Sequence, residues 1–572
     1  MHGGDQVAAV LKNQNVRWVF TLCGGHISPV LTGCNKIGIK IIDTRHESTA
    51  VFAADAVSRL SGTIGVATVT AGPGLTNCIT PIKNAQMAQS PILIIGGATA
   101  TVLKNRGSLQ DIDHLNLVKS ITKGCFSIRR VKTISKTIQR AISLSISGVP
   151  GPVYVEIPVD VLFPEEVVRN WYGLKSNNKS IPWWMSLYLK WNVNYLFNEN
   201  KTGLQQKQIN KPAKPSPTKK INKILGLIEK AKKPVLLIGS PIMLDVDKIP
   251  AVADSIKKLG IPTYVSGSAR SLLSKTDIPI FRYSRKNALK KADLVILFGV
   301  PCDFRLDYGR QINYKAKKIA INESLEDLFL NIRPNLYIQN SPATAIIDLA
   351  KKKIKNNWIS WLHLIQKTDE KKKKNIFLKA NEKTKNINPI KLFTVLDKHI
   401  SDDDIIIADG GDFVATASYV LRPRSYTGWL DPGVFGTLGV GAGFSLAAKL
   451  CHPKSTIWVI FGDGSFGYSL IEFDTFMRHK VPVIGIIGND AGWTQIARDQ
   501  VDILGDPVGT NLRYTNYHLA IKELGGFGIS VKKEEEINPA LVKAKQASLN
   551  GSSTVINVII DKTDFRKGSI SI

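Results

Sequence analysis

The chain has 572 residues, of which 44% are hydrophobic and 21% are charged. A single hydrophobic core stops growing near about 250–300 residues, so we expect two or three domains, and the composition excludes a largely disordered chain. No apolar run approaches the length of about 18 residues that a spanning helix needs, and the first residues contain no apolar signal-peptide region. The cysteines contain no C-x-x-C pair, which excludes a disulfide scaffold and a zinc ribbon and suits a reducing compartment. They are Cys23, Cys34, Cys78, Cys125, Cys302 and Cys451.

The chain is strongly basic, with 76 Lys and Arg against 46 Asp and Glu and a formal net charge of +30. Such a charge suits nucleic acid, an anionic membrane or a phosphate-rich ligand. The lysines cluster in 211–220, 351–357 and 370–375, which are typical solvated segments. The sequence has no zinc finger, RNP aromatic motif or basic zipper. We therefore expect a basic outer surface and no nucleic-acid partner.

Three blocks of the chain alternate short apolar runs with helical patterns, which predicts parallel sheets flanked by helices. We expect an N-terminal α/β domain over 1–165, a central α/β domain over 221–355 and a C-terminal α/β domain over 389–572. The predicted strands lie in 16–24, 38–45, 64–72, 91–97 and 152–159, then 233–241, 261–269, 292–300, 317–324 and 335–339, then 403–413, 456–467, 481–492 and 553–561. A charged, poorly apolar segment at 351–388 separates the last two blocks.

A Trp-rich strap and linker is expected over 166–220. Its residues Trp184, Leu187, Tyr188, Trp191 and Tyr195 follow helical spacing. Such a helix either lies on a membrane surface or packs on the protein itself, and packing is the interpretation that we favour here. At sixteen residues or so, the segment is too short to span a bilayer of about 30 Å.

The segment Gly462–Gly467 follows a predicted strand and opens a predicted helix over 466–480. Small residues let the backbone approach a phosphate, and a helix N-terminus attracts anions, although this G-x-G-x-x-G pattern serves dinucleotides equally well. Asp463 would repel a phosphate unless a divalent cation bridges the two. Asp490, at the end of the next predicted strand, either joins Asp463 on one Mg²⁺ or binds a ribose.

Two strand-to-helix turns in the first block also carry polar residues. Glu47 begins a predicted helix directly after the strand in 38–45, where an acidic residue is also stabilised by the helix dipole alone. Residues 70–77 form a second turn with a Gly-Pro-Gly bend, which a plain turn also explains. Ligands of parallel sheets gather at the carboxyl ends of strands, where both turns lie.

Taken together, these segments resemble the thiamine-diphosphate enzymes of the acetolactate synthase type over essentially the whole chain. The motifs are HE-x-x-A-x-x-A-A-D-A (46–56), AGPGLTN (71–77), GTLGVGAGFSLAAK (436–449) and GDGSFG (462–467). The segments GGHISPVL (24–31), RGSLQDIDH (106–114), GGDF (410–413), FDTFMRHK (473–480) and NDAGWTQI (489–496) resemble the subgroup of 2-hydroxyacyl-CoA lyases in particular.

The resemblance implies pyrimidine-binding, central and diphosphate-binding domains, with thiamine diphosphate and Mg²⁺ as cofactors. Glu47 would face the pyrimidine ring, with Pro73 and Asn77 nearby. Gly436 would accept the pyrimidine amine through its carbonyl, and Leu438 would bend the cofactor. The implied diphosphate contacts are Gly411, Asp412, Gly462, Asp463, Gly464, Ser465, Asn489 and Gly492. The implied metal ligands are Asp463, the carbonyl of Gly492 and either Asn489 or Asp490.

Two further residues have implied roles next to the substrate. Gln110 would contact the reacting group, and His26 would handle the proton of a 2-hydroxyl or simply bond to its own loop. Departures from the family pattern are Asp490 in place of an Asn and His26 in place of a small residue.

The resemblance implies cleavage of a 2-hydroxyacyl-CoA to formyl-CoA and an aldehyde one carbon shorter. Condensation of two pyruvates by an acetolactate synthase, whose substrate is a 2-oxo acid, is the alternative, and an inactive scaffold of the same fold is the other. The cofactor would lie between the first domain of one subunit and the third domain of another, so we expect a homodimer or homotetramer. Relatives in the subgroup often carry an N-terminal membrane anchor, which implies the endoplasmic reticulum membrane. This sequence shows no such anchor, and without one a cytoplasmic location is expected.

Overall fold

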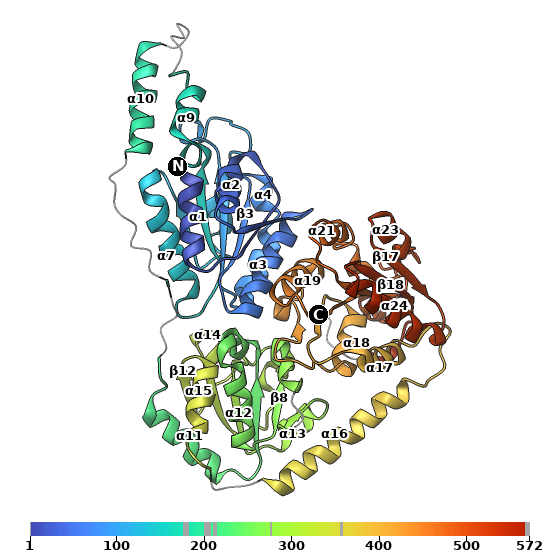
Figure 1. The fold of residues 1–572 in the computed structure, drawn as a ribbon. Coiled ribbons are helices and arrows are strands. Elements are labelled where there is room, and N and C mark those ends of the chain that lie inside the picture. The colour runs from blue at the N-terminus through green and yellow to red at the C-terminus, as the bar shows by residue number, and fades with distance from the viewer. Residues whose placement is uncertain are drawn as a thin grey trace. The chain divides into compact units, whose positions relative to one another are not determined.

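Three parallel sheets of six strands each organise the chain in a computed structural model (Figure 1). The structure describes residues 2–174, 182–198, 208–209, 214–274, 277–354 and 358–566. The chain divides into two units, Met1–Pro212 with one sheet and Ala213–Ile572 with two. The predicted α/β class with three helix-flanked parallel sheets is confirmed, whereas the exact residue bounds of the three domains stay a prediction.

The N-terminal sheet has the strand order β2-β1-β3-β4-β6-β5. Its chain runs from β1 out to β2 and returns to β3 on the other side, so the carboxyl ends of β1 and β3 flank a topological switch point. Five strands match predicted runs, and β5 was not predicted. The strands are β1 (Trp18–Thr21), β2 (Lys40–Asp43), β3 (Gly65–Val69), β4 (Ile92–Ala98), β5 (Gly124–Ser127) and β6 (Val153–Pro158).

Helices α1 (Gly3–Asn13), α2 (Ser28–Lys36), α3 (Glu47–Ser61) and α7 (Ile134–Ile146) flank this sheet. Helix α3 starts where the His46 side chain accepts the N–H of Ser48, and it ends at Gly62, whose φ of 68° is the left-handed conformation that glycine favours. Its Asp55 is fully buried and accepts two bonds from Arg59. Asp55 also accepts the side-chain amide of Asn84, and Arg59 donates to the Ser90 hydroxyl, so these bonds fix α3 against its neighbours with Glu47 at the sheet edge.

The central sheet has the order β12-β11-β10-β7-β8-β9, with its own switch point between β7 and β10. Apolar residues of α11 (Thr218–Lys230), α12 (Ile249–Leu259) and α15 (Pro342–Ala350) cover its strands. Only the short β9 was not predicted. The strands are β7 (Pro234–Ile238), β8 (Thr263–Val265), β9 (Ile280–Phe281), β10 (Leu294–Phe298), β11 (Lys317–Asn322) and β12 (Leu336–Gln339).

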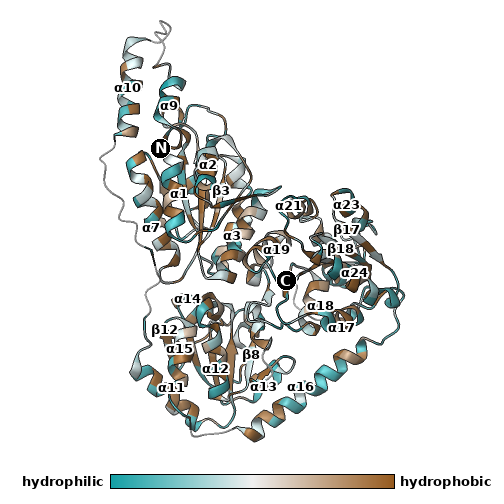
Figure 2. Cartoon of the chain, viewed as in Figure 1, coloured by the Kyte–Doolittle hydropathy of each residue, from teal (hydrophilic) through white to brown (hydrophobic). Residues whose placement is uncertain are grey.

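The C-terminal sheet, with the order β14-β13-β15-β16-β18-β17, has its switch point between β13 and β15. Strands β14 and β17 were not predicted. The strands are β13 (Ile405–Ala408), β14 (Trp429–Leu430), β15 (Ile457–Gly462), β16 (Ile484–Asn489), β17 (Phe527–Val531) and β18 (Thr554–Ile559). Figure 2 shows brown, hydrophobic strands in the middle of the sheets and teal, hydrophilic residues on the outer helices. The helices are α17 (Pro389–His399), α18 (Asp412–Val420), α19 (Val440–Cys451), α22 (Thr494–Leu504), α23 (Tyr517–Glu523) and α24 (Ile537–Leu549).

The predicted continuous helix over 466–480 is wrong. The chain instead forms α20 (Asp463–Phe466) and α21 (Glu472–Arg478), joined by tight turns. Ser469, between them, is fully buried, and its hydroxyl accepts the N–H of Ala442 in α19. This side-chain bond competes with helical geometry and pins the break to the neighbouring helix.

The charged segment at 351–388, for which no helix was predicted, contains α16 (Ile359–Lys379), and Figure 2 colours much of it teal. Its start is fixed to the central domain, because the indole N–H of Trp358 donates to the carbonyl of Ala231 and that of Trp361 to the carbonyl of Pro234. Further along, the Asp369 carboxylate accepts the N–H groups of Tyr283 and Ser284.

In the strap, α9 (Glu165–Trp171) lies beside α10 (Trp183–Phe197), which confirms the helix predicted from the spacing of the aromatic residues (Figure 1). Residues 175–181, 199–207 and 210–213 of the predicted strap and linker lie outside the described residues. None of the helices in the described part of the chain has both the length and the apolar character that crossing a bilayer requires.

Candidate active site

Glu47 stands at the first position of α3, next to the turn that follows β3. Its side chain is 6% exposed, and its carboxylate accepts a 3.0 Å bond from the amide of Asn77. Pro73 begins the short helix α4 (Pro73–Thr76) between them. A Cβ placed on Gly74 would lie 2.7 Å from the Thr70 side chain and 3.7 Å from the Glu47 carboxylate, so only glycine fits this approach. The structure therefore brings Glu47, Pro73 and Asn77 together, as the sequence predicted.

A buried pair of residues, which the sequence did not reveal, fixes the position of this turn. The N–H of Gly72, whose φ is 59°, donates to Nε2 of His114 at 2.8 Å, and Nδ1 of His114 lies 3.0 Å from the Glu156 carboxylate. Because an amide N–H only donates, Nε2 must accept, so the proton is on Nδ1 and the ring is neutral. Burial would raise the pKa of Glu156, but bonds from His114 and Lys104 outweigh it and lower that pKa.

Gln110 and His26 lie on opposite sides of this turn. Gln110 has a φ of 62°, and its Cβ would be 2.9 Å from a Cβ on Gly72, so its backbone covers the bend. Nδ1 of His26 is 3.1 Å from the hydroxyl of Thr70. Burial, together with the nearby His114, lowers the pKa of His26, so the ring is neutral around pH 7. Thr70 belongs to the turn after β3 and not to the loop of His26, so this bond differs from the predicted bond to its own loop, and the proton-handling role stays a prediction.

In the C-terminal sheet, Asp463 follows β15 and is 2% exposed. One carboxylate oxygen accepts the N–H of Gly464 at 2.9 Å, and the other accepts the N–H of Gly492 at 3.1 Å. Burial, followed by the charge of Asp490, raises the pKa of Asp463 to about 7. The hydroxyl of Ser465 donates to the Gly462 carbonyl, and the Trp493 ring would lie 2.5 Å from a Cβ on Gly464.

Asn489 and Asp490, the adjacent residues at the end of β16, have different surroundings. Asn489 is fully buried, and its amide group donates to Asn557 and to the carbonyl of Thr515, inside the sheet. Asp490 instead faces the edge, where burial raises its pKa while bonding to Thr494 and the charge of Lys562 oppose the rise. Among the two alternatives for a side-chain ligand, only Asp490 shares its electrostatic environment with Asp463.

The loops after β13 and β14 supply the other predicted contacts. Gly411 has a φ of 104°, and Asp412 forms a 2.8 Å ion pair with Arg498, which offsets its negative charge. Leu438 lies against Gly410, whose added Cβ would be 2.3 Å from the Leu438 side chain. Gly436 ends a 3₁₀ turn with a φ of 66°.

Asp409, which the sequence analysis did not single out, holds the Leu438 loop in place. Its carboxylate is 2% exposed and accepts the N–H groups of Gly439 and Gly441 at 2.9 and 2.7 Å. Burial raises the pKa of Asp409 to about 7 against those two bonds. The only signal in the sequence was an acidic residue directly after an apolar strand, which Asp412 shares.

The residues present fit Mg²⁺ and a diphosphate. Two buried carboxylates whose pKa values are raised lie at one sheet edge, an arrangement that a divalent cation would relieve. Among the described residues no group of three or more His, Cys, Asp or Glu side chains gathers, so the ion would take its other oxygens from backbone, phosphate and water. Gly411 and Gly462 leave room for such a ligand, because a Cβ on either would meet no atom closer than 3.8 Å.

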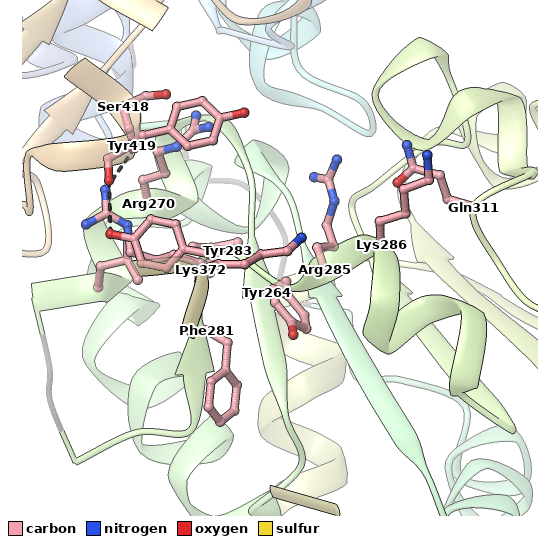
Figure 3. Close-up of a pocket in the computed structure, with 13 residues that line it drawn as sticks. Tyr264, Arg270, Phe281, Tyr283, Arg285, Lys286, Gln311, Lys372, Ser418 and Tyr419 are labelled. Carbon is pink, nitrogen blue, oxygen red and sulfur yellow. Dashed lines mark hydrogen bonds between the residues drawn. The ribbon is translucent and has the colours of Figure 1, made fainter. Parts of the chain in front are cut away.

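A separate pocket of about 280 Å³ lies between the central domain, α16 and α18 (Figure 3). Its lining includes five cationic side chains and no acidic one: Arg270, Arg282, Arg285, Lys286 and Lys372. Arg282 donates to the carbonyls of Ser418 and Leu421, and Arg285 to that of Arg305, so neutral groups bind them. Burial, followed by Arg270, lowers the pKa of Arg285. Arg270 forms a 3.6 Å ion pair with Asp431, and the other four cations still give the pocket an excess of positive charge.

Comparisons with known proteins agree with this geometry. Three descriptions of the thiamine pyrophosphate enzymes match, the N-terminal TPP binding domain at residues 1–117, the central domain at 221–349 and the C-terminal TPP binding domain at 409–558. Proteins named 2-hydroxyacyl-CoA lyase 2 are 45% identical in Danio rerio and 46% in Caenorhabditis elegans, over 100% of this chain and 93% and 91% of theirs. A protein named probable acetolactate synthase, from Mycobacterium bovis, is 29% identical over 98% of this chain and 96% of its own. The chain belongs to the thiamine pyrophosphate enzyme family, in the same branch as the proteins named 2-hydroxyacyl-CoA lyase 2.

Proposed function

We propose that the protein is a thiamine-diphosphate- and Mg²⁺-dependent lyase that cleaves a 2-hydroxyacyl-CoA to formyl-CoA and an aldehyde one carbon shorter. The observation that carries the choice of substrate is the cationic pocket, because coenzyme A bears several phosphates and pyruvate bears none. Ser418 and Tyr419 of α18 line this pocket, while Asp412 at the other end of α18 lies at the predicted diphosphate loop. Nine helical residues span about 13 Å. A long substrate with a charged end suits both places.

When bound, thiamine diphosphate supplies the electron sink for carbon–carbon cleavage. Glu47 would exchange a proton with the pyrimidine ring, and Asn77 orients its carboxylate. Asp463, Asp490 and the carbonyl of Gly492 would hold Mg²⁺. Asn489 keeps the end of β16 in register through Asn557.

The remaining residues shape the substrate side of the site. Leu438 would support the cofactor, and the carbonyl of Gly436 would accept its amine. Gln110 would contact the reacting group, and Nε2 of the neutral His26 ring would take up the proton of the 2-hydroxyl. The bond between Nδ1 of His26 and Thr70 would keep Nε2 directed toward the substrate.

The active form that we propose is a homodimer or homotetramer with each cofactor shared between the first domain of one subunit and the third domain of another. The resemblance to the lyase subgroup supports a place at the endoplasmic reticulum membrane, with peripheral contact through the strap. Sedimentation analysis and cell fractionation test these two points.

The test of the activity offers purified protein, thiamine diphosphate and Mg²⁺ with either a 2-hydroxyacyl-CoA or pyruvate. We expect formyl-CoA and the shortened aldehyde by mass spectrometry. Acetolactate from pyruvate would establish the alternative synthase activity, and no product from either substrate would favour an inactive scaffold.

A substitution in the pocket tests the substrate assignment separately. Arg285→Ala should raise the KM for the acyl-CoA about tenfold or more, because a charge-assisted bond contributes about 1.5–3 kcal/mol. The kcat and the affinity for thiamine diphosphate should stay unchanged. Arg333→Ala, an exposed arginine of the same unit, is the matched control. An unchanged KM in the Arg285 variant would contradict the pocket's role.

A further inference from the structure

Helix α10 presents a continuous aromatic face that the described protein leaves uncovered. Successive helical residues turn by about 100°, so the six large exposed side chains fall within a sector of about 140°. Trp183 is 76% exposed and Trp191 is 63% exposed. The six are Trp183, Trp184, Leu187, Tyr188, Trp191 and Tyr195.

The opposite side of α10 attaches the helix to the N-terminal unit. Val193 is fully buried and Leu196 is 1% exposed, and Leu196 is part of the core that α1 and α7 also build. Arg169 of α9 donates to the side chain of Asn194. The helix is thus held with its aromatic face outward, and the alternative in which these rings pack on the protein's own surface does not match their exposure.

The rings on this face contact each other and one cation. The Trp191 ring stacks on Tyr195 at 5.7 Å between centroids and on Tyr188 at 6.5 Å, and Arg130 lies 4.8 Å above the Tyr195 ring. Exposed apolar patches of this kind mark surfaces that bind something else. Trp and Tyr are also the residues that gather at the headgroup level of membranes.

Charge decides between a lipid surface and a protein partner. The sequence from 165 to 214 contains eight Lys and Arg residues and three acidic residues, Glu165, Glu166 and Glu199. On the helix itself Lys190 is exposed at the border of the aromatic face, and α10 contains no acidic residue. Basic residues near an anionic membrane contribute attraction, whereas charged residues are depleted at the centre of protein interfaces.

The length of α10 fixes how it meets the membrane. Fifteen residues extend about 22 Å, less than the hydrocarbon core of about 30 Å, so the helix cannot cross. We propose that α10 lies flat in the headgroup region of an anionic membrane, with the face centred on Trp191 inserted and Lys190 at the phosphates. This surface is independent of the catalytic activity proposed above.

Cosedimentation of the full chain with vesicles tests the proposal. We expect binding to vesicles that contain phosphatidylserine, much less binding to pure phosphatidylcholine, and a loss of binding at high salt. The variant Trp183→Ser, Trp184→Ser, Trp191→Ser should lower the bound fraction about tenfold or more. A matched control changes three exposed apolar residues elsewhere: Ile503→Ser, Leu549→Ser and Tyr314→Ser.

Three results would overturn the proposal. Wild-type protein that stays in the supernatant at low salt with every vesicle has no such surface. Equal binding by the tryptophan variant and the control places the contact elsewhere. A smaller oligomer for the tryptophan variant by light scattering, without vesicle binding by the wild type, makes the face an interface between copies. Because the rings are exposed, the variant should keep the wild-type Tm, which separates lost binding from misfolding.

Discussion

Strand for strand, the sheet β2-β1-β3-β4-β6-β5 and the sheet β14-β13-β15-β16-β18-β17 follow the same order, and both carry the predicted site residues at the same switch point. Their buried acids differ. In the N-terminal sheet, Glu47 is bound by the amide of Asn77, and Glu156 by His114 and Lys104. In the C-terminal sheet, Asp463 and Asp409 receive backbone N–H bonds.

This difference shows which features of the two sites come from the fold and which come from individual residues. The repeated topology brings loop residues to one edge in both sheets, while the partners of the acids decide the chemistry. Acids with side-chain partners are held in one position by those partners, Glu47 by Asn77 and Glu156 by His114 and Lys104. Acids that burial destabilises, such as Asp463 with a pKa raised to about 7, attract a metal ion instead.

The strongest test removes the acid that lacks a side-chain partner. Asp463→Ala should abolish Mg²⁺-dependent binding of thiamine diphosphate, because nothing else links the ion to the end of β15. Calorimetry measures the affinity, and the exposed Asp403→Ala serves as the control. Wild-type affinity in the Asp463 variant would contradict the metal assignment.

Glu47→Gln tests the other half of the comparison. An amide accepts the Asn77 bond but does not exchange a proton, so turnover should fall about 10²–10⁴-fold while cofactor binding remains. The control is Glu165→Gln, an exposed glutamate in α9. Normal exchange of the thiazolium proton in the variant, followed by NMR, would refute the role of Glu47.

His114→Leu examines whether the side-chain partners of the N-terminal half are needed. The variant leaves the N–H of Gly72 buried without an acceptor, at a cost of about 1–3 kcal/mol. We expect a lower Tm and a lower kcat, because the turn beside Glu47 loses its fixed position. His363→Leu, an exposed histidine, should change neither. A variant with wild-type Tm and kcat would show that the pair is dispensable.

Asp409 should make the stability of the protein depend on pH. Its folded pKa of about 7 lies above the ordinary value, so its contribution to stability is complete below about pH 4 and is lost as the pH rises to about 7. The slope is at most about 1.4 kcal/mol per pH unit. Asp409→Asn does not ionise, so the Tm of the variant relative to the wild type should increase between pH 5 and 8. A constant difference would place the pKa of Asp409 near its usual value.

The smallest effect is expected for Asp490→Asn. The amide keeps an oxygen for the metal and restores the residue of the family pattern, so affinity for Mg²⁺ and thiamine diphosphate should change by about threefold or less. A titration of Mg²⁺ against activity measures it. A loss as large as that of Asp463→Ala would make the two acids equal ligands.

Much of the fold followed from the sequence, since the long apolar runs that end in Gly or Asp became central strands. The strands that escaped prediction are short or only partly buried: β9 and β14 have two residues each, and β5 and β17 are half-buried over much of their length. Local patterns also missed the break at Ser469, which depends on a contact with α19.

The site was predictable where motifs are local and not where partners are distant. Glu47 and Asp463 stand beside strand ends, which the sequence reveals. His114 and Glu156 lie 42 positions apart and meet only in the folded sheet, and the role of Asn489 depends on Asn557, 68 positions away. Neither pairing has a signature in one sequence.

Helix α16 has a consequence for how this chain can diverge. Its two indoles fix one end, and Asp369 fixes the Tyr283 loop about two turns later. Removing one residue between Trp361 and Asp369 would rotate that carboxylate by about 100° and shift it by about 1.5 Å, away from the N–H groups of Tyr283 and Ser284. The exposed Lys371, Lys373 and Lys374 have no such constraint, whereas Lys372 lines the cationic pocket. During divergence, α16 therefore tolerates substitutions at its exposed positions, but it does not tolerate insertions or deletions between Trp361 and Asp369.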